Sequence, residues 1–249
     1  MIVTGERVVT QEGGFGPTWQ RHVAAYTLCE RFLPPGRILD LGCGVGHSFH
    51  LLAPRETVGV DLDAAALAGQ DRETVVADMR ALPFPDASFA GLISVQSLEH
   101  VADGATVVRE ARRVVAQGGV AVFHTPNRLT FARPDEIIDP YHFVEYDPEQ
   151  LRALCAGAFA QVELHGVFGS PRYLELWDAQ LRTLDRVLGL DPLRLRRFVP
   201  QRLRQLLYDL LLTLFRRRSD PREAAIGVGD FRLGSEDLGR ALDVVAVCR

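Results

Sequence analysis

The sequence contains no lysine, because all 28 of its basic residues are arginines. This absence excludes any chemistry that passes through a lysine Schiff base. Cysteine is also scarce. The four cysteines, Cys29, Cys43, Cys155 and Cys248, are widely scattered and form no C-x-x-C pair. We therefore expect neither a zinc site nor a disulfide framework, but reduced thiols in the cytoplasm.

Long apolar runs and an excess of positive charge are missing as well. The longest apolar run, residues 210–215, is too short to cross a bilayer, so no transmembrane segment is expected. Residues 1–16 lack the apolar centre of a signal peptide. The net charge of −4 argues against a nucleic-acid partner. With 249 residues, 47% hydrophobic and 24% charged, the chain is expected to form one soluble domain, 1–249.

Three glycines at alternate positions follow an apolar run that carries an acid. Residues 37–46 read Arg-Ile-Leu-Asp-Leu-Gly-Cys-Gly-Val-Gly, and a helix-compatible segment, residues 48–53, comes next. A strand, a glycine turn and a helix form a nucleotide-binding βα unit, in which the backbone approaches a ligand closely. A dinucleotide fingerprint needs its third glycine at position 47, which is His47. The pattern therefore favours another nucleotide-like ligand.

Two further apolar runs each end in an acid. Residues 57–60 lead into Asp61, and residues 74–77 lead into Asp78. A carboxylate at the end of a second strand can accept hydrogen bonds from both ribose hydroxyls. Such an acid also occurs in NAD enzymes, so Asp61 indicates an adenosine ligand rather than a reaction.

The glycine turn, the stretch LPFPDASF at 82–89 and the segment LEHV at 98–101 together resemble the class I S-adenosylmethionine-dependent methyltransferases, and specifically their type 11 group. The resemblance covers about residues 17–167 and the last strand. It implies S-adenosylmethionine as the cofactor. It also implies these cofactor-site residues: Asp40, Gly42, Cys43, Gly44 and Gly46 in the turn, Asp61 and Leu62 after the second strand, Asp78 and Met79 after the third, Gln96 after the fourth, and Tyr26 in the helix before the first.

The alternation of β and α signals predicts an α/β fold, a Rossmann-like seven-stranded sheet of order 3-2-1-4-5-7-6 with strand 7 antiparallel. The expected strands are residues 37–41, 57–60, 74–77, 90–95, 120–124, 162–167 and 242–248. The expected helices are 17–32, 63–70, 103–116, stopped by Gly118 and Gly119, and 147–156. The Rossmann-like core of the domain is expected to comprise residues 17–167 and 240–249.

Residues 170–225 are predicted to form a helical insert or cap between strands 6 and 7. Leucines at 203, 206, 207, 210, 211 and 214 give a helix with one apolar stripe. The stripe packs against the sheet or a second subunit, or it contacts a membrane surface through 201–218, because arginines flank it. The protein is expected to be a monomer or a homodimer.

Methyl transfer requires alignment of the reactants and a deprotonated acceptor. Histidine is the natural base near neutral pH, and His100 and His142 follow strands 4 and 5, where an open α/β sheet places its ligands. We therefore expect His142 or His100 to be catalytic. No cluster has the sequence spacing of metal ligands, so no metal is expected, with carboxylates assembled by folding as the open alternative.

The segments after strands 4 and 5 offer mostly polar side chains, among which Asn127, Tyr141 and Tyr146 are expected to contact the substrate. This inventory predicts O-methylation of a small polar or glycan-like acceptor. The leucine stripe favours an alternative, a lipid-linked or isoprenoid acceptor. A non-catalytic binding member of the fold is a further alternative. An NAD(P) dehydrogenase is disfavoured by His47 and by the stretch at Asp78.

Overall fold

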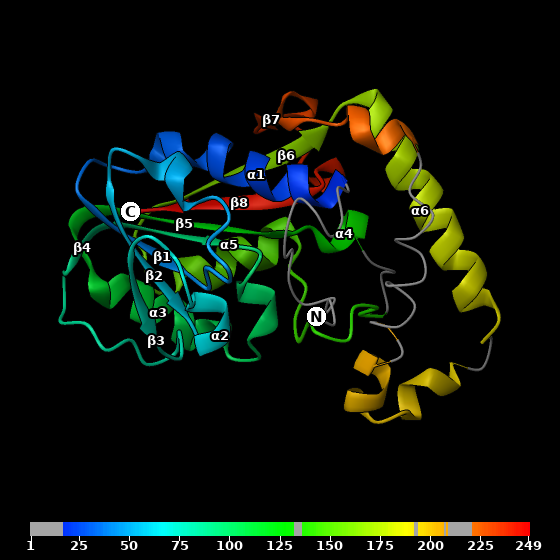
Figure 1. Ribbon diagram of the computed structural model, residues 1–249, viewed down its shortest axis with the longest axis horizontal. Coiled ribbons are helices and arrows are strands. Elements are labelled where there is room, and N and C mark those ends of the chain that lie inside the picture. The colour runs from blue at the N-terminus through cyan, green and yellow to red at the C-terminus, as the bar shows by residue number, and fades with distance from the viewer. Residues whose placement is uncertain (1–16, 132–135, 192–193, 207, 209–220) are drawn as a thin grey trace.

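A computed structural model describes residues 17–131, 136–191, 194–206, 208 and 221–249. They form one eight-stranded sheet of order β3-β2-β1-β4-β5-β8-β6-β7, with helices on both faces (Figure 1). The strands are β1 (Arg37–Leu41), β2 (Glu56–Asp61), β3 (Glu73–Val76), β4 (Phe89–Val95), β5 (Val115–Pro126), β6 (Val162–Gly169), β7 (Phe231–Gly234) and β8 (Asp243–Cys248).

The predicted fold class and the order of the seven predicted strands are confirmed. Strands β1 to β5 run parallel to one another, and β8 lies antiparallel between β5 and β6. Parallel strands place their carboxyl ends at one edge of the sheet, which is where an α/β fold binds its ligands. The acids Asp61 and Asp78 and the segment after β4 therefore share that edge.

The predicted count of seven strands is wrong, because β7 adds an eighth at the edge. It pairs antiparallel with β6, from Gly166 opposite Gly234 to Gly169 opposite Phe231. Its four residues are too few to show a period-2 pattern in the sequence. Pairing with β6 is what makes this short segment a strand.

The expected helix after the glycine turn is only a short 3-10 helix, η2 (Phe49–Leu52). Pro54 follows almost at once and disfavours helical backbone in the residue before it. The expected helix at 63–70 is likewise a single turn, α2 (Ala64–Leu67), which precedes Gly69 at φ +78°.

The boundary between the third predicted helix and the fifth strand also differs from the prediction. The helix, α3 (Gly104–Val114), ends before the two glycines, and β5 begins at Val115. Gly118 and Gly119 therefore lie inside the strand. Phe89 pairs with Val115 and Gly91 with Val120, so the register shifts between them. An irregular strand start of this kind has the same glycine signature as a helix end.

Two apolar layers cover the sheet. On one face, α3 and α5 (Pro148–Ala156) pack Val107, Ala111 and Leu151 against the strands. On the other face, α1 (Pro17–Cys29) packs Ala24 and Ala25. Asp147 caps α5, as its Asp-Pro sequence predicts, and Gln150 completes a capping box. The remaining short helices are η1 (Glu30–Phe32), η3 (Leu98–His100), α4 (Arg128–Phe131), η4 (Leu195–Phe198), η5 (Pro221–Ala225), η6 (Val228–Asp230) and η7 (Leu238–Arg240).

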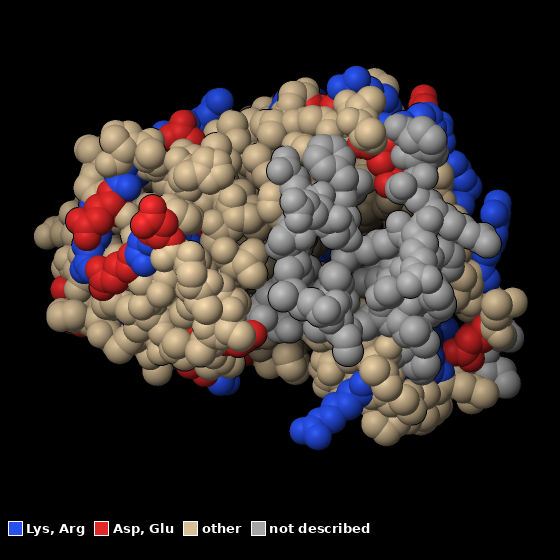
Figure 2. Space-filling model, in the orientation of Figure 1, with Lys and Arg blue, Asp and Glu red and all other residues tan. Residues whose placement is uncertain are grey.

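Helix α6 (Pro171–Gly189) begins beside β6, where Tyr173 and Leu176 join the core, and then extends along one end of the molecule (Figure 1). Basic side chains follow this outer edge (Figure 2). Most of the predicted leucine stripe, residues 207 and 209–220, lies outside the described residues. Leu203 and Leu206, at its start, are exposed. None of the helices in the described ranges combines the length and apolar composition needed to cross a membrane.

Candidate active site

The glycine turn after β1 requires glycine for two different reasons. Gly42, Gly44 and Gly46 all have positive φ, at 72°, 54° and 68°. A Cβ on Gly42 would collide with the side chain of Ser97. A Cβ on Gly44 would meet no atom within 4 Å. The backbone of Gly44 therefore borders open space, which allows a ligand to approach it closely.

Asp61 lies beside this space at the end of β2. Its Oδ2 accepts a hydrogen bond from the amide of Gly44 (2.8 Å) and its Oδ1 one from the amide of Asp63 (2.9 Å). The carboxylate is thus held facing the glycine turn. Two large apolar side chains flank it at the same edge of the sheet: Leu62 is 71% exposed and Val76 is 54% exposed. Exposed apolar side chains beside a fixed acid can bind a ligand that is part apolar and part polar.

The third predicted acid, Asp78, pairs with Arg80 at 2.6 Å. The hydrogen bonds from Arg80 hold the pKa of the Asp78 carboxyl below its usual value. Met79 reaches back to the glycine turn, where its Cε would lie 3.0 Å from a Cβ on Gly42. Residues that follow β1, β3 and β4 therefore meet at the glycine turn.

Asp40 is fully buried beneath the turn and has two partners. The hydroxyl of Tyr26 donates to its Oδ1 (2.8 Å), and Nη1 of Arg72 lies 2.8 Å from its Oδ2. Burial raises the pKa of the Asp40 carboxyl even though both partners stabilise its charged form. Arg72 could not be predicted as the partner of Asp40, because the pair forms only when the residues before β3 fold against β1. Cys43 is buried beside it, and burial raises the pKa of its thiol to about 12.

Aromatic rings form one wall next to the turn. The ring of His47 lies 4.6 Å from that of Trp19 and 6.1 Å from those of His22 and Tyr26. Burial lowers the pKa of His47 to about 4 and that of His22 to about 3. Both histidines are therefore neutral at pH 7.

Gln96 has the left-handed φ of +51° directly after β4. Such a φ is uncommon for a residue other than glycine and is over-represented at functional sites. Its side-chain amide donates to Oδ1 of the buried Asp243 at 2.8 Å. Asp243 also pairs with Arg21 at 2.5 Å and lies 3.5 Å from Nε2 of His124. This buried network, which the sequence did not reveal, fixes the orientation of Gln96.

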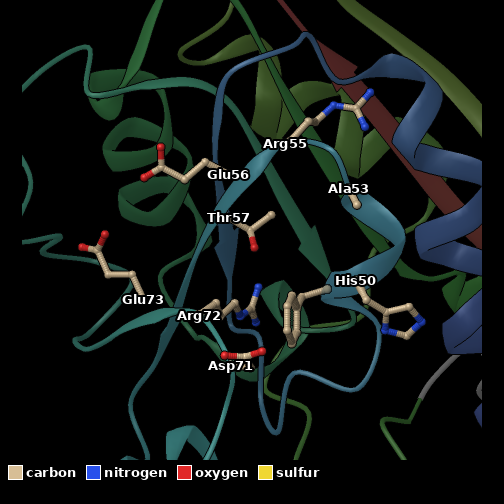
Figure 3. Close-up of a pocket in the computed structure, with 9 residues that line it drawn as sticks. His50, Ala53, Arg55, Glu56, Thr57, Asp71, Arg72 and Glu73 are labelled. Carbon is tan, nitrogen blue, oxygen red and sulfur yellow. The ribbon is translucent and has the colours of Figure 1, made fainter.

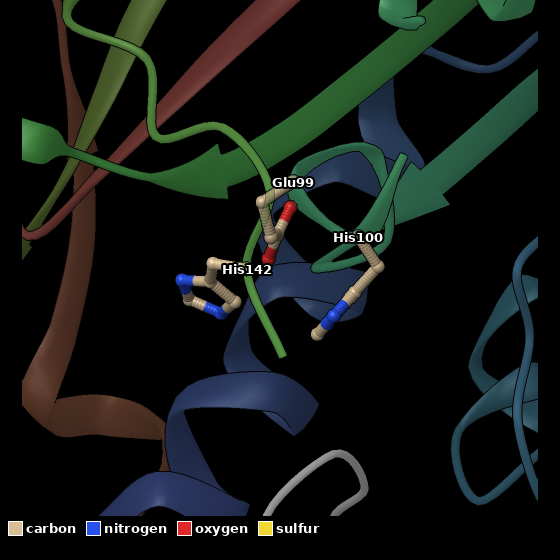
Figure 4. Close-up of side chains that lie close together, drawn as sticks. All are labelled: Glu99, His100 and His142. Atoms are coloured by element: carbon tan, nitrogen blue, oxygen red, sulfur yellow. The ribbon is translucent and has the colours of Figure 1, made fainter. Parts of the chain in front are cut away.

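The two predicted catalytic histidines lie together. Their ring centroids are 5.1 Å apart, and Figure 4 shows Glu99, His100 and His142 converging. His142 Nδ1 is 3.0 Å from Oε1 of the buried Glu145. Burial by itself lowers the pKa of His142, but the hydrogen bond that its ring donates to Glu145 and the charge of Glu99 outweigh burial, so the pKa is raised.

Two of the three predicted substrate residues are used inside the fold. The Nδ2 of Asn127 donates to the carbonyls of Leu238 and Ala241, and the side chain is fully buried. Tyr146 packs in the core beside α3, and burial raises its pKa to about 12. Tyr141 lies nearer the histidines, since its carbonyl contacts His100 Nδ1 at 3.0 Å. Of the three, Tyr141 is the one placed beside the cluster.

A separate cavity of about 370 Å³ lies to the side of the glycine turn (Figure 3). It is lined by Phe49, His50, Ala53, Arg55, Glu56, Thr57, Asp71, Arg72 and Glu73. Glu56 and Glu73 begin their strands, so this cavity extends to the opposite edge of the sheet from Asp61. It contains none of the predicted site residues, and we place the active site at the carboxyl edge.

Comparisons with known proteins identify the family of the chain. The methyltransferase domain family matches residues 39–123, which run from β1 into β5. A Mycobacterium tuberculosis protein named "Probable S-adenosylmethionine-dependent methyltransferase" is 32% identical over 185 residues, covering 71% of this chain and 68% of the relative. A malonyl-[acyl-carrier protein] O-methyltransferase of Halorhodospira halophila is 38% identical over 122 residues, 43% of this chain and 41% of the relative.

Among solved structures, a methyltransferase from Thermotoga maritima superposes with a TM-score of 0.61 at 15% identity, covering 93% of this chain and 90% of that one. At this identity the likeness shows the fold alone. The identity and coverage of the mycobacterial relative show the family. The chain belongs to the S-adenosylmethionine-dependent methyltransferases, and S-adenosylmethionine is its cofactor.

Proposed function

We propose that this methyltransferase acts on a hydroxyl oxygen of a small, polar, sugar-like acceptor. The observation that carries the proposal is the buried pair of His142 and Glu145, which faces His100 and Glu99 at the carboxyl edge of the sheet. A hydroxyl must lose its proton on methylation, and a histidine oriented by a carboxylate is suited to receive it. One relative named above is an O-methyltransferase, which supports an oxygen acceptor, although its own acceptor is a malonyl group on a carrier protein rather than a sugar.

S-adenosylmethionine supplies an electrophilic methyl group when it is bound. The open space at Gly44 would admit it, Asp61 would hold its ribose hydroxyls, and Leu62 with Val76 would contact its adenine. Tyr26 and the neutral ring of His47 would exclude water from the end of the site opposite the adenine. Holding reactants in this way can contribute on the order of 7–11 kcal/mol to the acceleration.

His142 would accept the proton of the acceptor at Nε2, because Nδ1 is engaged by Glu145. The positive ring that results would be stabilised by Glu145 and by Asp139, whose Oδ2 lies 4.0 Å from Nε2. Catalysis by a positioned base of this kind contributes roughly 100- to 10,000-fold.

Aromatic rings next to the histidines support a sugar-like acceptor. Phe131 lies 5.4 Å from the ring of His142, and Trp177 of α6 stacks with Phe131 at 6.0 Å. A sugar presents an apolar C–H face to such rings and hydroxyls to the polar groups. The exposed Phe198, Leu203 and Leu206 of the insert favour the alternative, a lipid-linked acceptor. The scattered, buried cysteines are consistent with a cytoplasmic location.

The acceptor proposal is tested by assaying S-adenosylhomocysteine release with panels of free sugars, lipid-linked sugars and amines. We expect turnover with hydroxyl acceptors, and His142→Ala should lower kcat by about 100-fold or more while leaving the affinity for S-adenosylhomocysteine unchanged. His50→Ala is the matched control, because it removes an exposed histidine side chain outside the proposed catalytic cluster. Turnover with amines alone, or less than a tenfold loss in His142→Ala, would contradict the proposal.

The cofactor side is tested by calorimetric titration with S-adenosylhomocysteine. Asp61→Ala should lose charge-assisted hydrogen bonds worth about 1.5–3 kcal/mol, which weakens binding by roughly 10- to 150-fold. Asp86→Ala removes an exposed acid that pairs with Arg113 and should leave the affinity unchanged. An unchanged affinity in Asp61→Ala would show that the ribose is held elsewhere.

A further inference from the structure

Glu99, His100 and His142 meet more closely than a single proton acceptor requires. One ligand atom from each lies within 4.8 Å of the other two. Two residues come from η3 after β4 and the third from the loop after β5, so the cluster forms only on folding (Figure 4). This is why the sequence, which shows no metal-ligand spacing, predicts no metal.

The hydrogen bonds of the two histidines leave the same ring nitrogen, Nε2, available to a ligand. Nδ1 of His100 is 3.0 Å from the carbonyl oxygen of Tyr141, which can only accept, so Nδ1 must carry the hydrogen. Nδ1 of His142 is 3.0 Å from a carboxylate oxygen of Glu145. In a neutral ring with a protonated Nδ1, Nε2 carries the lone pair. Metal-binding histidines are fixed in this way, by a carbonyl or carboxylate on the other ring nitrogen.

Glu99 has a carboxylate oxygen without a hydrogen-bond partner. The side chain is fully buried, its Oε2 accepts from the hydroxyl of Thr125 at 2.8 Å, and its Oε1 makes no hydrogen bond. Within the described parts of the chain, no arginine pairs with Glu99 or with the buried Glu145. Buried carboxylates without a compensating charge are costly, and a coordinated cation is one of the ways in which proteins offset that cost.

We propose that Glu99, His100 and His142 bind a divalent first-row metal ion, with Mn²⁺ and Zn²⁺ as the best-suited ions. Two imidazoles and one carboxylate favour such an ion over Mg²⁺ or Ca²⁺, which prefer oxygen ligands alone. Three protein ligands leave coordination positions open, and Glu145 with Asp139 adds negative charge around the site.

What the ion would do rests on the proposed function, because the cluster lies at the carboxyl edge of the sheet, where the acceptor is proposed to bind. It would orient the acceptor hydroxyl and lower the pKa of that hydroxyl, so that its proton could be lost to water. In the metal-bound protein His142 would be a ligand. It would act as a free base only in the metal-free protein. Binding of the ion itself does not depend on the identity of the acceptor.

The experiment is a calorimetric titration of the chelator-stripped full chain, free of any histidine tag, with MnCl₂ and with ZnCl₂. We expect one ion per chain. His100→Ala and Glu99→Gln should each weaken binding about tenfold or more, and Glu145→Gln by about 10- to 100-fold, since it orients His142 from outside the ligand set. His50→Ala and His165→Ala, histidines outside the cluster, should bind the ion as the original chain does. Titration of each variant with S-adenosylhomocysteine verifies its fold.

A chain that takes up neither ion overturns the proposal, and so does His100→Ala with unchanged affinity. His100 is only partly buried, so this variant decides the matter even if Glu99→Gln fails to fold. Full methylation activity after complete metal removal would overturn the catalytic role of the ion and leave the proposed function standing. Failure to bind S-adenosylhomocysteine would overturn the proposed cofactor site, and the metal titration would not change.

Discussion

At the scale of single residues, Gly44 joins backbone geometry to ligand space. Its φ of +54° disfavours any side chain, and the space beyond it is open. Gly118 is a natural comparison, because it has φ +78° and equally open surroundings but lies at the start of β5, on the far edge of the sheet. Comparing alanine substitutions at the two glycines therefore separates the cost of backbone strain from the cost of a blocked ligand site.

We predict that Gly44→Ala and Gly118→Ala each lower the free energy of unfolding by about 1–2 kcal/mol, the cost of a left-handed alanine. Only Gly44→Ala should also weaken the binding of S-adenosylhomocysteine, by tenfold or more, roughly 1.4 kcal/mol. Urea unfolding and calorimetry measure the two quantities. Equal affinities in the two variants would mean that the cofactor does not approach Gly44.

The sequence predicted the residues whose position follows from a strand end, and it missed their partners. Asp61 and Asp78 were predictable because each follows an apolar run, and parallel strands bring such ends to one edge. Arg72 and Thr125 were not, because nothing local marks a residue that will pair with Asp40 or Glu99 across the sheet. Asn127 looked like a substrate contact because its burial cannot be read from a polar loop.

At the scale of elements, the buried ion pair of Arg21 and Asp243 connects α1 to β8. The side chains are 6% and 0% exposed, and two hydrogen bonds of 2.7 and 2.5 Å join them. Burial by itself raises the pKa of Asp243, but the charge of Arg21, and then that of His124, outweighs it and holds the pKa below its usual value. Removing one partner would leave an uncompensated buried charge.

We predict that Arg21→Met lowers the free energy of unfolding at pH 7 by about 3–5 kcal/mol. Because the folded pKa of Asp243 is depressed, its stabilisation is present above the unfolded value of about 3.9 and is lost as pH falls further. The difference between Arg21→Met and the original chain should therefore shrink below about pH 4. Urea unfolding at pH 7 and at pH 3 measures it.

Arg232→Met is the matched control, since Arg232 and Glu236 form an ion pair with both side chains more than 60% exposed. It should change stability by less than about 1 kcal/mol. A loss of similar size in both variants would show that burial of the Arg21 pair adds nothing.

The presence of a helix or strand was easier to predict than the residues at which it begins and ends. The helix through Val107 and Ala111 was correctly predicted from its apolar spacing. Its end was placed at residue 116, just before Gly118 and Gly119, because a glycine pair marks a helix stop and a strand irregularity alike. Strand β7 was missed because it is stabilised by its neighbour β6 rather than by its own pattern.

At the scale of the whole molecule, ligand binding is coupled to folding. At a concentration of 100 times its Kd, S-adenosylhomocysteine should add about 2.7 kcal/mol to the free energy of unfolding. For a chain of this size the melting temperature should rise by roughly 5–10 °C. NADH at the same concentration should leave it unchanged. A shift with NADH and none with S-adenosylhomocysteine would contradict the cofactor assignment.

The place of β8 in the sheet also has a consequence for the order in which the chain emerges from the ribosome. Strand β8 is synthesised after β5 and β6, yet it is inserted between them. Until it arrives, both neighbours have open edges, and Arg21, made long before, has no Asp243 to pair with. Open strand edges invite pairing with other chains. We therefore expect nascent chains that stall before β8 to be the form of this protein that chaperones must protect.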